Sequence, residues 1–207
     1  MKCVRIKSQV EENLSTITFN TTFTISPHRP NSTTSGVSVT FVIMLSLDAP
    51  LPESKGLHLG LNIYTSLDGD PSNHLVTIEL DTMKESFDPD DNHIGLNVNS
   101  VISNVTANLT TFDIEITPVN VTNYTLWIDY DEASHVIRVH MSKPTVPVLS
   151  QPLDLSEFVL QHSYFGFIAS IRTTYELNHV LAWNLTVEKL PDDSDNDGAP
   201  AWKLGVF

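Results

Sequence analysis

The sequence has 207 residues, of which 41% are hydrophobic, so it is long and apolar enough to bury the core of one domain. Its formal net charge is -14, with 11 Lys and Arg against 25 Asp and Glu. This balance argues against nucleic acid or an anionic membrane surface as the partner, because binding to either needs clustered cations. No apolar run is long enough to span a membrane.

Alternating polar and apolar residues, separated by Pro-, Gly- and Asn-rich turns, predict strands along most of the chain. The helical exception is a short turn at 154–161, and the acidic tail at 191–207 is expected to be a linker or disordered. We therefore predict one all-β domain at 1–190, an antiparallel sandwich with Trp127 and Trp183 in its core. The main predicted strands are 17–25, 36–47, 76–81, 93–98, 112–116, 124–130, 135–141, 164–171 and 180–187.

Cysteine content and sequons bear on the cellular compartment. Cys3 is the only cysteine, so no intrachain disulfide can form. Residues 1–14 lack the apolar segment of a signal peptide. However, the chain has more Asn-x-Ser/Thr glycosylation sequons than chance would give. We expect an extracellular or secretory-pathway location and a true start upstream of Met1. The sequons begin at Asn13, Asn20, Asn31, Asn104, Asn108, Asn120, Asn123 and Asn184.

The stretch from Val76 to Ser100 is the strongest candidate site. Alternation along its first strand places Glu79 and Asp81 on one face. An acidic loop containing Asp88 follows, and His93 opens the next strand. Carboxylates combined with imidazole suit manganese, and carboxylates alone suit calcium. The alternative is an acidic hairpin exposed to water.

Several motifs together carry a family resemblance. The acidic stretch contains VTIELDT at 76–82, Asp88-Pro89 and NHIGLNVNS at 92–100. Outside it stand DPSNH at 70–74, LWIDYD at 126–131, DLSEFVL at 154–160 and VLAW at 180–183. In combination they resemble legume-type (L-type) lectins, and most closely the extracellular domain of plant lectin receptor kinases. The resemblance runs from about residue 4 to about residue 187.

The resemblance implies a fold and an assembly. The family fold is a concanavalin-A-like jelly-roll β-sandwich with a flat back sheet and a curved front sheet. The family's N-terminal strands have no counterpart before Met1, so we expect the fold to lack them. By the same resemblance the partner is a glycan, and a homodimer is conceivable.

The resemblance also implies a metal site. Glu79, Asp81, Asp88 and His93 match the family's manganese ligands, and Ser103 matches a serine that reaches manganese through water. Asp81 and Asp88 also match the carboxylates that hold calcium. In the family these ions fix the loops that bind sugar and perform no catalysis.

Departures from the family pattern concern the sugar site. Val37 stands where the family has a hydrogen-bonding Asp or His, and Glu85 stands where it has the Asn of the calcium loop. The loop between Asp81 and Asp88 looks shorter than the family loop, so we do not expect the calcium cage to close. Manganese is the preferred ion, because all four of its matching ligand types are present. Gly56 matches a glycine of the sugar site. We expect weak or absent sugar affinity, and a trans peptide bond before Val37.

Other functions stay open beside the lectin interpretation. The chain could be a non-sugar-binding interaction module or a remnant of a lectin receptor kinase. Glu79, Asp81 and Glu85 also resemble the E-x-D-x-x-E signature of sandwich-fold glycoside hydrolases. A retaining pair needs carboxyls about 5–5.5 Å apart, whereas Glu79 and Glu85 would be about 20 Å apart on a continuous strand. We therefore predict no catalytic activity.

Overall fold

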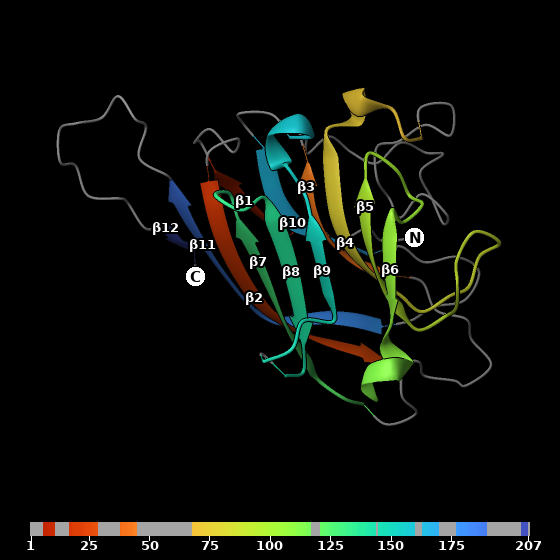
Figure 1. The fold of residues 1–207 in the computed structure, drawn as a ribbon. Coiled ribbons are helices and arrows are strands. Elements are labelled where there is room, and N and C mark those ends of the chain that lie inside the picture. Colours follow the sequence, from red (N-terminus) through yellow and green to blue (C-terminus); the bar gives the residue numbers. More distant parts are fainter. Residues whose placement is uncertain are drawn as a thin grey trace, which may run out of the picture.

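The structure is a computed structural model that describes residues 6–10, 17–28, 38–44, 68–116, 121–143, 145–159, 163–169, 177–189 and 204–206. Two antiparallel sheets of six strands each pack face to face (Figure 1). Helix within the described residues is confined to three short 3-10 helices. The predicted all-β sandwich is therefore confirmed.

The front sheet, as we call the sheet that carries the acidic stretch, has the spatial order β1-β10-β3-β4-β5-β6. Its neighbouring strands all pair antiparallel. The acidic stretch supplies β4 and β5, which lie next to each other near one edge. The strands are β1 (Ile6–Val10), β10 (Ser163–Ala169), β3 (Val39–Met44), β4 (Leu75–Asp81), β5 (His93–Val98) and β6 (Val105–Asn108).

The back sheet has the order β12-β11-β2-β7-β8-β9 and is also antiparallel throughout. Its edge strand β12 comes from the tail and pairs with residues 185–187 of β11. The strands are β12 (Leu204–Val206), β11 (Leu177–Lys189), β2 (Ile17–His28), β7 (Tyr124–Asp131), β8 (Val136–Met141) and β9 (Leu149–Pro152).

The core between the sheets is rich in aromatic rings. Phe23 of β2 meets Phe167 of β10 edge to face, with ring centroids 4.8 Å apart. Phe167 in turn meets Trp183 at 5.1 Å, so the prediction that Trp183 packs against the core is confirmed. These contacts join strands of opposite sheets, and edge-to-face geometry stabilises them beyond the area that they bury.

Trp127 was predicted in the core, and this prediction is wrong. Along β7 buried and partly exposed side chains alternate, and Leu126 and Ile128 take the buried positions. Trp127 therefore lies on the outer face of the back sheet, between Thr22 of β2 and His140 of β8.

The predicted strand at 112–116 is also wrong. A 3-10 helix, η5 (Leu109–Phe112), occupies its start, and Asp113 follows with a left-handed backbone (φ 59°). The Asn92 side chain takes the place of a strand partner: its Nδ2 donates to the Ile114 carbonyl at 2.7 Å, and its Oδ1 accepts from Ile116 N–H at 2.9 Å. The alternation still places both isoleucines in the core.

The other two 3-10 helices are η4 (Pro71–Asn73) and η6 (Leu155–Glu157). The predicted helical turn at 154–161 corresponds to η6, where Asp154 accepts from the N–H of Ser156 as the N-cap. Within the described ranges, no helix combines the length and the hydrophobicity that a membrane span requires.

Candidate metal centre

The antiparallel pairing of β4 with β5 determines which residues of the site lie opposite one another. Asp81 lies directly opposite His93, and Glu79 directly opposite Gly95. Val76, Ile78 and Leu80 of β4 point into the core, so Glu79 and Asp81 point to the other face of the sheet, as the alternation predicted. That face is nevertheless buried, with exposed fractions of 4% for Glu79 and 8% for Asp81.

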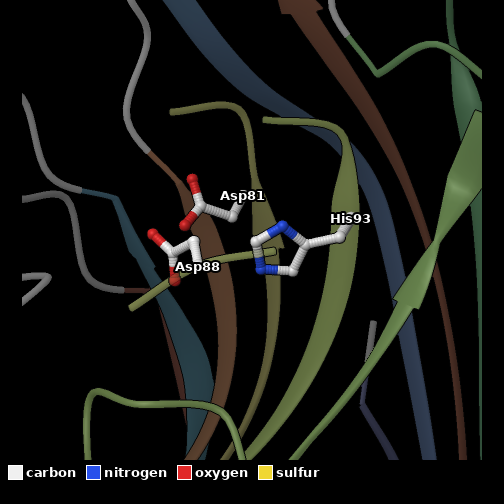
Figure 2. Close-up of side chains that lie close together, drawn as sticks. All are labelled: Asp81, Asp88 and His93. Carbon is white, nitrogen blue, oxygen red and sulfur yellow. The ribbon is translucent and has the colours of Figure 1, made fainter. Parts of the chain in front are cut away.

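Two carboxylates accept hydrogen bonds from backbone N–H groups of the loop at 82–92. Asp81 Oδ1 accepts a hydrogen bond from Met83 N–H at 2.7 Å, and Asp88 Oδ2 accepts one from Glu85 N–H at 2.8 Å. Asp88 is thereby brought beside Asp81 and His93 (Figure 2). One ligand atom from each of these three residues lies within 4.8 Å of the other two.

His93 is oriented from behind by the backbone. Its Nδ1 lies 3.0 Å from the carbonyl oxygen of Asp90. Because a carbonyl can only accept, we assign the proton to Nδ1, which leaves a lone pair on Nε2. The Nε2 atom is buried and has no hydrogen-bond partner among the described residues. A histidine whose Nδ1–H donates to a backbone carbonyl, and whose buried Nε2 carries a free lone pair, is typical of a metal ligand.

Further contacts anchor the loop to the start of η5. Asp90 Oδ2 accepts from Asn108 Nδ2 at 2.8 Å. Asn92 donates to the Thr110 hydroxyl at 3.0 Å, and its carbonyl accepts from Leu109 N–H at 3.0 Å. The residues that orient His93 are therefore themselves fixed to the next segment of the chain.

A second set of contacts surrounds Glu79. Its Oε2 accepts from Asn97 Nδ2 at 2.8 Å, and Asn97 Oδ1 accepts from the Ser103 hydroxyl at 2.8 Å. Asn97 is fully buried and lies two positions beyond Gly95, on the same face as His93. Asn97 thus joins Glu79 to Ser103.

Burial and mutual repulsion disfavour charge on these carboxyls. Burial raises the pKa of Asp81 to about 8, and the negative charges of Glu79 and Asp88 add to the rise. Burial likewise raises the pKa of Glu79 to about 7, although hydrogen bonds from Ser38 and Asn97 oppose it. A divalent cation between the carboxylates would reverse this balance by favouring their charged forms.

The donor set fits a transition metal. Asp81, Asp88 and His93 bring one ligand atom each within 4.8 Å of one another, and the Nε2 of His93 is buried without a hydrogen-bond partner among the described residues. Carboxylate oxygens and an imidazole nitrogen are both donors that divalent metal ions accept in proteins. The residues that would hold such an ion are Asp81, Asp88 and His93.

A second group of residues whose side chains could bind a metal is instead explained by hydrogen bonds within the fold. Glu132, His135 and Asp154 also bring ligand atoms within 4.8 Å of one another. However, Glu132 Oε2 accepts from the Tyr130 hydroxyl at 2.5 Å, and Asp154 Oδ1 accepts from Ser156 N–H at 2.9 Å. The Tyr130 hydroxyl in turn accepts from Leu155 N–H at 3.2 Å, so these residues join the end of β7 to η6 within the fold.

Comparison with known proteins decides the family. The profile of the legume lectin domain matches residues 2–201. The chain belongs to this family. It is 30% identical over 222 residues to L-type lectin-domain containing receptor kinase V.9 of Arabidopsis thaliana, covering 86% of this chain and 33% of the relative. It is 34% identical over 187 residues to receptor kinase VIII.2 of the same plant, covering 87% and 25%.

Solved structures agree with the fold of this lectin domain. A peanut lectin structure with a bound 9-residue peptide superposes with a TM-score of 0.74 at 21% identity, covering 92% of this chain and 82% of that lectin. The chain spans about a third or less of the receptor kinases that it matches. The legume lectin domain is a non-catalytic fold, and family members are secreted proteins or receptor ectodomains.

The structure brings together three of the four predicted manganese ligands of the lectin domain, Asp81, Asp88 and His93. Glu79 lies outside this group and is hydrogen-bonded to Asn97. Ser103 reaches the same Asn97. Of the residues considered for the sugar site, Glu85 donates its N–H to Asp88, whereas Val37 and Gly56 lie outside the described residues.

The sequence interpretation overlooked Asn97 and Asn92. Asn97 was detectable, because it continues the period-two series His93, Gly95 on the face of the predicted site. Asn92 carried no comparable signal, since its partners are backbone groups of a segment that was predicted to be a strand.

Proposed function

We propose that this lectin domain is a carbohydrate-binding module whose 82–92 loop is organised by a divalent cation, with manganese as the preferred ion. Asp81, Asp88 and His93 are the proposed ligands. The observation that carries the proposal is the buried, bare Nε2 of His93 beside two carboxylates. A bound cation would supply the positive charge that lets buried carboxylates ionise, and so fix the loop.

Glu79 and Ser103 act differently in this proposal. Their contacts with Asn97 hold the floor of the site on β4 and β5. Glu79 contributes negative charge close to the cation, and Ser103 contributes a hydroxyl group within the same network. Calcium is the less suitable ion, because the three converging ligands include a nitrogen donor.

Glycan affinity of this chain is proposed to be weak. Other legume lectins of this fold bind simple sugars; one solved example is complexed with galactose. Glu85 stands where those proteins are expected to present an amide, and a carboxylate cannot donate a hydrogen bond to a hydroxyl. A buried sugar hydroxyl left without a partner costs about 1–3 kcal/mol, and each 1.4 kcal/mol is about tenfold in affinity.

The second candidate function is an interaction module that has lost sugar binding, as part of a receptor-kinase-like ectodomain. Glu85 favours this second function as well, because its carboxylate adds negative charge to a loop that is already acidic. A partner of this loop would then present cationic or metal-binding groups rather than sugar hydroxyls.

Calorimetric titration with mannosides and galactosides, in saturating manganese and calcium, tests both candidates. We expect at most millimolar sugar binding by the wild type and a gain of affinity in Glu85→Asn. The exposed Glu115, changed to Asn, serves as a control for net charge. Micromolar sugar binding by the wild type that Glu85→Asn does not improve would contradict the weak-affinity proposal. No sugar binding in either form would favour the interaction module.

A further inference from the structure

Two glycosylation sequons face each other across neighbouring strands of the back sheet. One is Asn20-Thr21-Thr22 on β2, and the other is Asn184-Leu185-Thr186 on β11. In the antiparallel register Asn20 pairs with Thr186, and Thr22 pairs with Asn184. Each asparagine is therefore opposite the threonine that completes the other sequon.

All four sequon side chains point away from the core. The middle residues Thr21 and Leu185 are buried, with exposed fractions of 0% and 1%. Alternation then directs both asparagines to the outer face, where each is exposed. They occupy diagonal positions of the ladder, which in an antiparallel sheet lie about 7–8 Å apart.

The Asn20 amide contacts the neighbouring strand β7. Its Nδ2 donates to Asp129 Oδ1 on β7. An N-linked sugar replaces one of the two Nδ2 hydrogens, so one N–H remains to donate. The Asn108 amide at another sequon makes the same kind of contact, with Asp90 of the metal loop. Modification at Asn20 and Asn184 lies on the back sheet, whereas the metal centre lies on the front sheet.

We propose that Asn20 and Asn184 form a paired N-glycan attachment site, and that an oligosaccharide there covers the outer face of β2 and β11. The inference rests on the extracellular placement of the chain. Nδ2 forms a bond to C1 of the first sugar of an activated oligosaccharide, and the C1–O bond to its diphosphate leaving group breaks. The leaving group takes the electron pair, and one Nδ2 proton passes to solvent.

The proposed glycan has a consequence for assembly. The same outer face carries the partly exposed Trp127, and Thr22 lies next to it in the register. Flat packing of a second chain on this face would have to accommodate a bulky, hydrated oligosaccharide beside Trp127. We therefore expect the glycosylated chain to be a monomer.

Expression in a eukaryotic secretory host, with a secretion signal supplied, tests the site independently of where the native chain resides. Release of N-glycans in heavy-oxygen water marks each modified Asn by its conversion to labelled Asp, which peptide mapping detects. We expect label at Asn20, Asn184 or both in most molecules. Label at other sequons with none at this pair would overturn the proposal.

Matched variants separate the sequon from the fold. Thr22→Ala and Thr186→Ala should each abolish label only at Asn20 or Asn184, respectively, and Thr24→Ala on the same face should change neither. Because peptide mapping of the wild type is informative alone, a variant that fails to fold does not block the test. Light scattering should give a monomer mass for the glycosylated chain, and a stable dimer would contradict the consequence for assembly.

Discussion

A Cβ atom on Gly95 would lie 2.1 Å from the hydroxyl oxygen of Ser103, so the Ser103 side chain rests against the bare backbone of β5. The same hydroxyl donates to Asn97, which in turn donates to Glu79. The absence of a side chain at Gly95 is therefore a condition for the contacts that hold Glu79 beside Asp81.

Gly95→Ala tests this dependence. The added methyl group must displace Ser103 or shift β5, and overpacking of this kind costs about 1–3 kcal/mol of unfolding free energy. Denaturant unfolding should show the loss, and Ser103→Ala in the same background should restore part of it, because the clashing oxygen is gone. Equal stabilities of Gly95→Ala and the wild type would show that the contact is not tight.

Asn92→Ala tests the link between the metal loop and the segment after η5. The change removes side-chain hydrogen bonds to Thr110, Ile114 and Ile116. Buried backbone groups left without partners cost about 1–3 kcal/mol each. We expect lower stability and faster proteolysis between residues 109 and 116. The exposed Asn123, changed to Ala, is the control; proteolysis that is equal in both variants would contradict the role of Asn92.

The raised carboxyl pKa values predict the pH dependence of the metal-free protein. Burial raises the pKa of Asp81 to about 8 and of Glu79 to about 7. A carboxyl whose pKa is raised in the folded state stabilises the fold at low pH and loses that contribution as pH rises toward its folded-state pKa. Thermal unfolding in a chelator should therefore show a falling Tm between about pH 5 and about pH 8.

Asp81→Asn provides the control for this window, because it removes one titrating group while keeping the shape of the side chain. Its Tm should fall less steeply than that of the wild type over the same pH range. Saturating manganese should also reduce the fall in the wild type, since the cation stabilises the charged carboxylates. A wild-type Tm that rises with pH in chelator, relative to Asp81→Asn, would contradict the assignment.

Much of the fold and part of the site follow from local patterns. Period-two alternation placed Ile78 in the core and Asp81 on the other face, and the break after Asp81 marked the loop. Such patterns depend only on neighbouring residues. They misplaced Trp127, because aromatic character suggested burial, whereas strand phase is decided by Leu126 and Ile128.

Long-range contacts explain what the sequence could not supply. Residues 112–116 alternate like a strand, yet Asn92, which is distant in sequence, supplies their hydrogen bonds in place of a neighbouring strand. The convergence of Asp88 with Asp81 depends on backbone contacts within the loop, such as Glu85 N–H to Asp88. Residue type and family resemblance predicted the ligands but could not show that Glu79 would also accept a hydrogen bond from Asn97.

Metal content after loading tests the central claim most directly. Wild-type protein is incubated with manganese, freed of excess ion by gel filtration and analysed by elemental mass spectrometry, beside Asp88→Asn and Asp91→Asn. Asp91 is an exposed carboxylate of the same loop and controls for charge. We expect about one manganese per chain in the wild type and in Asp91→Asn, and a marked loss in Asp88→Asn. A wild type that retains no manganese, or an Asp88→Asn variant that retains as much as the wild type, would contradict the proposed metal centre.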